Sequence, residues 1–292
     1  MHAHQLDVSA RDVRRLLARQ FPQWADESVR RLPSYGTTNA MYRLGHDKVA
    51  RLPFIPGDGA SIAEEARTLQ RIEGVLPVPT PRLLAIGEPD TVYPFRWSVL
   101  SWLPGHMPVP ERLAHSDVFV DDLVGFLHEL RKLPAESMRV AQRGGGLAPL
   151  DAEVREAIAV LDGEYDAAVL TALWDDALAA EPWGAAPLWV HSDLLPSNLL
   201  VDAHGRLAGV LDWASAGVGD PACELLAAWN VFPARARERF RVGLGCDDAT
   251  WRRGRGWAVS QAALALPYYR NTNPGMVEMA ARALAALMQE PV

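Results

Sequence analysis

The feature that most constrains the fold is a change of residue pattern near residue 103. Before it, the chain is divided into short apolar runs bounded by turn residues, which is typical of β-strands. After Pro104 and Gly105, longer stretches carry the 3.6-residue apolar period of amphipathic helices. We therefore predict an α+β fold in which a small β-rich lobe, residues 1–103, precedes a larger and mainly helical lobe, residues 104–292.

The first lobe contains signals for helices as well as strands. Ser9 and Asp12 have the spacing of a capping box, which opens an amphipathic helix. A second helix is predicted over residues 61–74, with Ile62 and Leu69 on its apolar face. A turn over residues 45–47 joins two strands as a hairpin. The strands are expected at 29–33, 40–44, 48–52, 82–86 and 95–102.

The second lobe is predicted to be helical apart from three short apolar strands. A strand at 187–190 precedes strands at 198–202 and 207–211, and these last two form a tight hairpin. Asp220 and Pro221 favour a helix start, because Asp caps the first turn and Pro fits within it. The helices are expected at 115–133, 151–180, 221–230, 234–242, 256–268 and 275–289.

Composition places the chain among ordinary globular proteins. Of its 292 residues, 49% are hydrophobic and 22% are charged. No apolar run approaches the roughly 18 residues of a membrane span, and no signal peptide opens the chain, so we expect a cytoplasmic protein. The net charge of −7 argues against nonspecific nucleic-acid binding and suits a cationic small substrate. Cys223 and Cys246 make neither a disulfide framework nor a metal box.

The strongest chemical signal lies around the hairpin of the second lobe. Asp193 and Asn198 follow the strand at 187–190, and Asp212 ends the hairpin. The hairpin brings these polar side chains to one edge, where a divalent cation is the natural counter-charge. Phosphoryl transfer needs one carboxylate for the attacking hydroxyl, and an amide and a second carboxylate for Mg²⁺. The alternative is that Asp193 and Asn198 are only turn residues.

Three segments of the second lobe carry a resemblance to a known family. Residues 191–198, 210–213 and 217–221 together resemble the aminoglycoside phosphotransferases, which are similar to macrolide phosphotransferases and choline kinases. The resemblance covers nearly the whole chain, from the loop at 34–39 to the helix that carries Tyr268 and Tyr269. It implies a bilobal protein-kinase-like fold with a small antiparallel-sheet lobe and a larger helical lobe.

The resemblance also implies roles for individual residues of the second lobe. Asp193 is the expected catalytic base, and Asn198 and Asp212 are the expected ligands of Mg²⁺. His191 is expected to brace the loop through a bond to the backbone near Asp212. The resemblance suggests that Asp220 also braces the metal loop, and we expect its role to be structural.

In the first lobe, the resemblance points to residues that grip the nucleotide phosphates. Kinase-like enzymes place a lysine on the third strand, and Arg51 occupies the matching place here, where its fork of donors suits phosphate oxygens. Lys48, three residues away, falls on the opposite strand face. Glu65 is the expected partner of Arg51 because it flanks the apolar face of its helix, whereas Glu64 points away. The alternative for Arg51 is a surface strand residue.

Further nucleotide contacts are expected from a loop and from the end of the first lobe. Gly36, Thr37, Thr38 and Asn39 lie between two strands and can donate backbone N–H groups and hydroxyls to phosphates. With a single glycine, this loop taken alone is an ordinary turn. The nucleotide base is expected between the lobes, against the backbone from Leu100 to Leu103.

The acceptor pocket is predicted in the helices beyond Asp220. Acidic residues there would suit a polyamine-like antibiotic, and aromatic residues a bulkier macrolide or nucleoside, although helix packing explains the aromatics equally well. The candidates are Glu224, Trp229, Trp257, Tyr268 and Tyr269.

Together these features predict a phosphotransferase that uses ATP or GTP with Mg²⁺ to phosphorylate a hydroxyl of a small molecule. An antibiotic of the aminoglycoside, macrolide or nucleoside type is the expected acceptor, which would give resistance. The alternatives are a metabolic kinase for choline, homoserine or a sugar, and a kinase-like protein that binds without catalysis. No nucleic-acid or membrane partner is expected, and a monomer or a weak dimer both fit the sequence.

Overall fold

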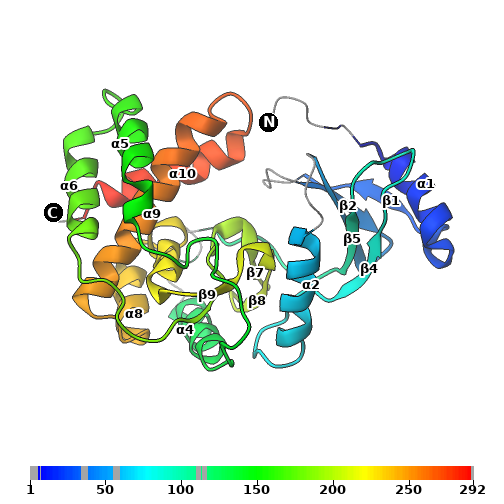
Figure 1. The fold of residues 1–292 in the computed structure, drawn as a ribbon, viewed down its shortest axis with the longest axis horizontal. Helices are drawn as coiled ribbons and strands as arrows, with labels where there is room; N and C mark the ends of the chain where they lie inside the picture. The colour runs from blue at the N-terminus through cyan, green and yellow to red at the C-terminus, as the bar shows by residue number, and fades with distance from the viewer. Residues whose placement is uncertain are drawn as a thin grey trace. The chain divides into compact units, whose positions relative to one another are not determined.

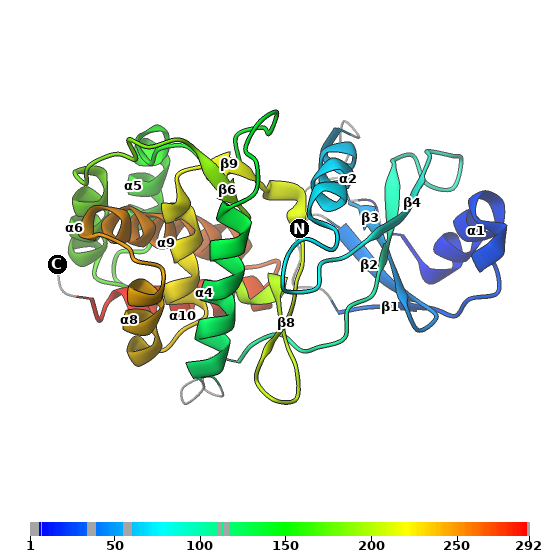
Figure 2. The same ribbon diagram turned by 90° about the horizontal axis from the view of Figure 1, so that it is seen from below.

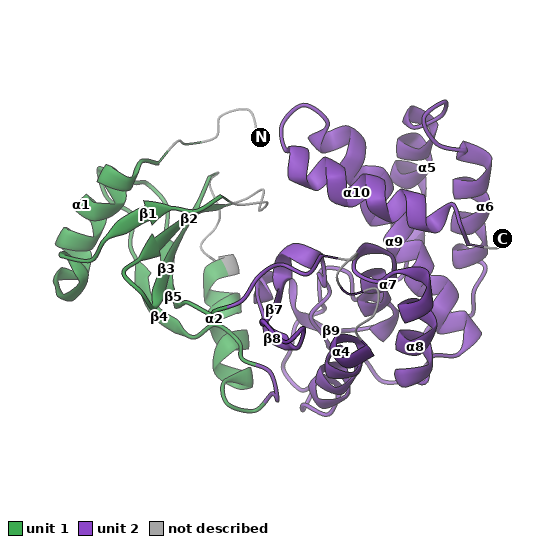
Figure 3. Ribbon diagram, turned by 180° about the vertical axis from the view of Figure 1, so that it is seen from behind, with its two compact units in different colours: residues 1–75, 79–104 green, residues 76–78, 105–292 purple. Residues whose placement is uncertain are grey.

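The computed structural model describes residues 6, 8–33, 39–54, 60–109, 113 and 117–290. The chain divides into two compact units (Figure 3). Unit 1 comprises Met1–Val75 and Pro79–Pro104, and unit 2 comprises Leu76–Val78 and Gly105–Val292. The predicted α+β class is confirmed, since unit 1 contains an antiparallel sheet and most helices lie in unit 2.

Unit 1 is built on one antiparallel sheet with the strand order β1-β2-β3-β5-β4 (Figure 1). Helix α1 (Ala10–Gln20) and a 3₁₀ turn, η1 (Pro22–Trp24), precede the sheet, and α2 (Ala60–Ile72) follows β3. The strands are β1 (Val29–Arg31), β2 (Asn39–Leu44), β3 (Lys48–Pro53), β4 (Leu83–Gly87) and β5 (Trp97–Ser101).

The start of α1 follows from its sequence. Ser9 accepts a hydrogen bond from the Asp12 N–H at 3.2 Å, and the Asp12 carboxylate accepts the Ser9 N–H, which is the predicted capping box. Val13, Leu16 and Leu17 are buried against the sheet as part of the unit 1 core. Burial of this apolar stripe, more than helix propensity, holds α1 in place.

The β2–β3 hairpin fixes which residues of unit 1 face each other. Gly45 has φ of +51°, a conformation that glycine adopts without strain, so the turn closes at the predicted position. The resulting register sets Arg51 opposite Met41 on one side and Ser98 of β5 on the other. Arg51 is thereby held in a central strand of the sheet.

Unit 2 contains helices and two small two-stranded sheets (Figure 2). In one sheet β6 pairs with β9, and in the other β7 pairs with β8 as the predicted hairpin. Helix α4 packs on β6. The strands are β6 (Leu188–Val190), β7 (Leu199–Val201), β8 (Leu207–Val210) and β9 (Gly217–Gly219), with the 3₁₀ turns η2 (Ala148–Leu150), η3 (Pro196–Asn198), η4 (Trp213–Ser215) and η5 (Pro221–Leu226). The helices are α4 (Asp117–Arg131), α5 (Asp151–Val160), α6 (Ala167–Leu178), α7 (Ala227–Asn230), α8 (Ala234–Gly243), α9 (Asp248–Tyr269) and α10 (Pro274–Leu287).

Two predicted helices of unit 2 are divided in the structure. The helix expected over 151–180 is interrupted after α5, where Gly163 has φ of +89° and breaks the helical path before α6. The helix expected over 221–230 begins as the 3₁₀ turn η5 and becomes α-helical only in α7. Asp220 caps this segment by accepting the Ala222 N–H at 2.9 Å, as predicted.

Helix α9 starts eight residues earlier than the predicted residue 256. Its first turns are rich in arginine, so the apolar period gave no signal there. Arg253 is buried because its Nε donates to Asp220 at 2.7 Å, and Arg255 is buried beside Asp176. Gly254 lies so close to Leu225 that an added Cβ would meet it at 2.4 Å. Charge pairing thus replaces apolar packing at this end of the helix.

Among the described residues, no helix is both long enough and apolar enough to span a bilayer.

Candidate active site

The loop that follows β6 is held in a strained backbone conformation. Ser192, next to Asp193, has φ of +65°, and Asp212 at the end of the β7–β8 hairpin has φ of +58°. Such angles cost about 1–3 kcal/mol for residues other than glycine and persist where the surroundings enforce them. His191 supports the conformation at Asp212, because its Nε2 donates to the carbonyl of the preceding residue, Leu211, at 2.8 Å. This bond confirms the predicted bracing role of His191.

Asp193 and Asn198 are joined directly. The Nδ2 of Asn198 donates to Oδ2 of Asp193 at 2.8 Å and to the Asp193 carbonyl at 2.8 Å. The turn between them is fixed by Leu195, whose N–H donates to the Asp193 carbonyl at 2.8 Å. Because both bonds use the amide nitrogen, the Oδ1 atom of Asn198 is left to accept or to ligate.

Asp212 is brought to the same edge by the hairpin. Leu199 pairs with Val210, and the Leu211 N–H donates to the Asn198 carbonyl at 2.8 Å. Asp212 therefore directly follows a residue whose backbone is hydrogen-bonded to Asn198. Trp213 is buried, and its ring lies 4.8 Å from that of His191.

Glu224 supports this loop from the interior. Its Oε1 accepts the backbone N–H groups of His191 and Ser192, the latter at 3.1 Å, and the side chain is fully buried. Its Oε2 makes no hydrogen bond within the described part of the chain. Burial raises the pKa of this carboxyl, and the nearby His191 opposes that rise.

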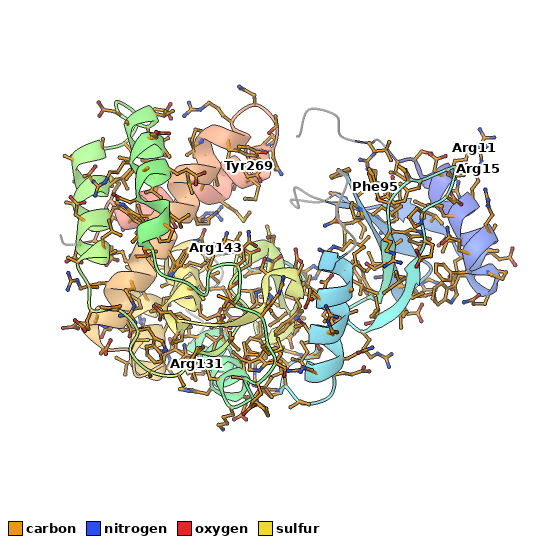
Figure 4. The ribbon with its side chains drawn as sticks, viewed as in Figure 1. Arg11, Arg15, Phe95, Arg131, Arg143 and Tyr269 are labelled. Carbon is orange, nitrogen blue, oxygen red and sulfur yellow. The ribbon has the colours of Figure 1, made fainter. Side chains whose placement is uncertain are left out.

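Arg143, which was not predicted from the sequence, lies on the segment between α4 and α5 (Figure 4). Its Nη1 donates to Oδ1 of Asp193 at 2.8 Å and to the Ser192 carbonyl at 2.9 Å. Asp193 thus has Arg143 on one carboxylate oxygen and Asn198 on the other. Nothing in the local sequence around Arg143 signals this contact, since 50 residues separate it from Asp193.

In unit 1, the predicted ion pair between Arg51 and Glu65 is present. Nη1 of Arg51 donates to Oε1 and Oε2 of Glu65 at 2.7 and 2.8 Å, and both side chains are largely buried. Glu64, one residue earlier, instead pairs with Arg67 along the outside of α2. Lys48 contacts a different set of groups, with Nζ at 2.9 Å from Glu27 and 2.5 Å from Asp47. The geometry separates Arg51 from Lys48, as strand alternation predicted.

The structure describes only some of the other nucleotide candidates. Gly36, Thr37 and Thr38 lie outside the described residues, and Asn39 is the first residue of β2. Leu100 is buried in β5 between Val49 and Leu83. Leu103 is half-buried just beyond the strand, and its backbone groups bond to none of the described residues.

The acceptor candidates fall into two groups by exposure. Glu224, Trp229 and Trp257 are buried, and the ring of Trp229 lies 4.8 Å from that of Trp251. Tyr268 is 57% exposed and packs edge-on against Tyr269 at the end of α9, where Figure 4 labels Tyr269. The two tyrosines can reach a ligand, whereas burial places the other three side chains in the protein interior.

The edge formed by Asn198 and Asp212 fits a hard divalent cation. Mg²⁺ prefers oxygen ligands and retains several waters, so it needs only one or two carboxylates and an amide from the protein. Oδ1 of Asn198 and the Asp212 carboxylate would offer such oxygens from the two ends of the hairpin, where the Leu211 N–H bonds to the Asn198 carbonyl. The described residues contain no cluster of three or more His, Cys, Asp or Glu side chains that would indicate a transition-metal site.

Comparison with known proteins identifies relatives along most of the chain. A curated Bacillus subtilis protein, the uncharacterized YcbJ, is 30% identical over 195 residues, which is 62% of this chain and 58% of that protein. The chain therefore spans less than two thirds of the length of the curated relative it matches.

Solved structures share the fold at low sequence identity. The GDP complex of wild-type aminoglycoside 2'-phosphotransferase-IIIa is 18% identical with a TM-score of 0.76, covering 96% of this chain and 99% of that one. Macrolide 2'-phosphotransferase from Brachybacterium faecium is 22% identical with a TM-score of 0.62, covering 97% and 99% of the two chains. The sequence model of the phosphotransferase enzyme family matches residues 28–257. The chain belongs to the phosphotransferase enzyme family.

Proposed function

We propose that this protein is an NTP-dependent O-phosphotransferase that transfers the γ-phosphate of ATP or GTP to a hydroxyl of a small molecule. The observation that carries the proposal is the bond of Asn198 to Asp193 beside the hairpin that ends at Asp212. This arrangement supplies a fixed carboxylate next to oxygens that suit Mg²⁺, which is what phosphoryl transfer requires of a protein.

Asp193 is the group we assign to the acceptor hydroxyl. Its carboxylate is held from two sides and is one-fifth exposed, so it can still meet a substrate. It accepts the hydroxyl proton as the hydroxyl oxygen attacks phosphorus. A fixed orientation is the main contribution here, because holding reactants in line removes much of the entropic cost of the reaction.

Asn198 and Asp212 are the residues we assign to Mg²⁺. The cation, when bound, neutralises charge on the phosphate oxygens. Asn198 couples the two functions, because the amide that would offer Oδ1 to Mg²⁺ also holds Asp193 through Nδ2.

Arg51, Glu65, Asn39 and Leu103 are the residues of unit 1 that we assign to the nucleotide. Glu65 holds Nη1 of Arg51, which orients the guanidinium toward phosphate oxygens. The backbone of Leu103 offers a donor and an acceptor for the base. Related phosphotransferases were solved with GDP, ADP and ATP, so either purine nucleotide is compatible with the proposal. Cells hold these nucleotides in the cytoplasm, where we place the enzyme.

An antibiotic is the acceptor class that we favour, which would make the protein a resistance enzyme. Relatives were solved with kanamycin, gentamicin and streptomycin, and others are macrolide phosphotransferases. The net charge of −7 suits a cationic aminoglycoside. Tyr268, which is exposed, and Tyr269, which is half-buried, are the candidates for acceptor contact.

The test measures Mg²⁺-dependent ATP and GTP consumption with kanamycin, gentamicin, streptomycin, a macrolide, choline and homoserine. Asp193→Asn should lower kcat by about 10³-fold with the productive acceptor, within the range for loss of a general base. Asp121→Asn is the matched control, because it removes a carboxylate from a surface pair with Arg239. Near-normal turnover by Asp193→Asn would show that the assignment is wrong.

A further inference from the structure

The segment 139–144 is fixed on β9, the strand that follows the proposed Mg²⁺ ligand Asp212. The Ala141 N–H donates to the Val218 carbonyl at 3.0 Å, and the Val218 N–H donates to the Arg139 carbonyl at 2.9 Å. The backbones at Gly144 and Gly219 lie closer together than a side chain at Gly219 would allow, because an added Cβ there would lie 2.3 Å from the Cα of Gly144. Glycines at both positions let the two backbones meet, and this anchors Arg143 beside Asp193.

Within the described part of the chain, the guanidinium of Arg143 donates hydrogen bonds only through Nη1. Of its five N–H donors, the two on Nη1 bond to Asp193 and to the Ser192 carbonyl. Nε and Nη2 donate to no group among the residues that the structure describes. The side chain keeps 21% of its surface exposed, and Asp193 keeps 20%. Three N–H donors are therefore available beside the carboxylate.

A structural arginine of the same unit shows the contrast. Arg253 donates from Nε and Nη2 to Asp220, from Nη2 to Thr250 and from Nη1 to the Glu181 carbonyl, so every nitrogen has a partner. Its side chain is 9% exposed. Every nitrogen of the Arg253 guanidinium is hydrogen-bonded and the side chain is buried, as expected of an arginine that only supports the fold. Arg143 has neither property, and its Nη1 bonds to the carboxylate of the proposed base and to the Ser192 carbonyl.

We propose that Arg143 is a catalytic residue that fixes Asp193 through Nη1 and binds the phosphoryl group in transit through Nη2 and Nε. The inference rests on the proposed phosphotransferase function. The acceptor oxygen must lie within hydrogen-bond reach of Asp193, and Asp193 itself lies 2.8 Å from Nη1 of Arg143. The phosphorus that this oxygen attacks is therefore within reach of the unused side of the guanidinium, which matches phosphate oxygens in shape and charge.

The acceptor hydroxyl gives its proton to Asp193, and its oxygen forms a bond to the γ-phosphorus. The bond between the γ-phosphorus and the oxygen that bridges it to the β-phosphorus breaks, and the nucleoside diphosphate leaves with that electron pair. Charge is spread over the phosphoryl oxygens during this exchange, and the fixed positive charge of Arg143 stabilises it.

The experiment compares Arg143→Met, Arg143→Lys and Arg143→Ala with the wild type and with Asp193→Asn, using the acceptor and nucleotide that the wild type consumes. Arg143→Met should lower kcat by about 10²–10³-fold, the usual loss for one transition-state donor, with nucleotide KM changed by less than about threefold. Arg143→Lys should recover part of kcat, because it keeps the charge without the fork. Arg239→Ala, which removes a surface arginine of the same unit, is the control and should leave kcat unchanged.

Chemical rescue separates catalysis from support. Millimolar guanidinium chloride, far below denaturing concentrations, should restore turnover to Arg143→Ala in a saturable way and leave Asp193→Asn inactive. Turnover of Arg143→Met within threefold of the wild type would overturn the inference, as would a loss that guanidinium does not rescue. If Arg143→Met does not fold, Arg143→Lys provides the test. An Arg143→Lys variant with an unchanged Tm and either full activity or no activity would count against the proposal. A wild-type protein that consumes no nucleotide with any acceptor would instead contradict the proposed function.

Discussion

The Arg51–Glu65 pair of unit 1 and the Arg143–Asp193 pair of unit 2 have the same chemistry in different surroundings. Each joins one guanidinium nitrogen to a carboxylate at 2.7–2.8 Å. Glu65 has 6% of its side chain exposed and accepts Nη1 with both oxygens, whereas Asp193 has 20% exposed and shares its oxygens between Arg143 and Asn198. In unit 1 the buried carboxylate of Glu65 holds the guanidinium of Arg51 in place. In unit 2 the guanidinium of Arg143 holds the partly exposed carboxylate of Asp193 in place.

This difference predicts which kinetic constant each arginine controls. A guanidinium that is fixed by a buried carboxylate is preorganised to bind an anion, so Arg51 should contribute mainly to nucleotide affinity. A guanidinium beside the base should act mainly on the step of transfer. Variants of the Arg51–Glu65 pair in unit 1 and of Glu224 in the interior of unit 2 test that contrast.

Within unit 1, the largest effect is expected for Arg51→Ala. Loss of a charged hydrogen-bond donor to phosphate costs about 1.5–3 kcal/mol, which raises nucleotide KM by about 10–100-fold. Acceptor KM should change little, and Arg51→Lys should recover part of the nucleotide affinity. Steady-state kinetics with varied nucleotide measure the effect, and Arg30→Ala, at an exposed residue of β1, is the control. Unchanged nucleotide KM would remove Arg51 from the site.

A smaller effect is expected for Glu65→Gln. The amide keeps one acceptor for Nη1 of Arg51 but loses the charge and the second acceptor, so the guanidinium is held less firmly. Nucleotide KM should rise by about 3–10-fold, less than in Arg51→Ala. Glu64→Gln, one residue earlier and paired with Arg67, should behave like the wild type. Equal effects at the two glutamates would show that helix charge alone is responsible.

The smallest effect on turnover, and a distinct effect on stability, is expected for Glu224→Gln. Burial raises the pKa of Glu224 above its ordinary value of 4.5, so its protonated form is favoured in the folded state. Its contribution to the free energy of unfolding is therefore fully present below pH 4.5 and is lost as the pH rises through the raised pKa. Within that window the slope is at most about 1.4 kcal/mol per pH unit.

Glu224→Gln cannot titrate, so its stability relative to the wild type should increase as the pH rises from 4.5. Urea unfolding at a series of pH values measures this difference. Glu278→Gln, an exposed carboxylate on α10, is the control and should show no such trend. A difference between wild type and Glu224→Gln that is independent of pH would show that the buried carboxyl does not titrate in this window.

Local patterns were sufficient for much of unit 1 and for the hairpin of unit 2. The capping box of Ser9, the turn at Gly45 and the alternation that separates Arg51 from Lys48 depend on residues close in the sequence, and all are present in the structure. The start of α9 was missed for the opposite reason. Arg253 and Arg255 are buried only because Asp220 and Asp176, distant in the sequence, neutralise them.

The sequence by itself determined the α+β class and the order of Asp193, Asn198 and Asp212 around a short hairpin, because turn chemistry and apolar periodicity act over a few residues. Only the tertiary structure decided that Arg143 lies against Asp193 and that Glu224 is buried beneath the loop rather than facing an acceptor. Both contacts join segments more than 30 residues apart, where pairing depends on packing between backbones, such as that of Gly144 on Gly219. No local pattern encodes such packing.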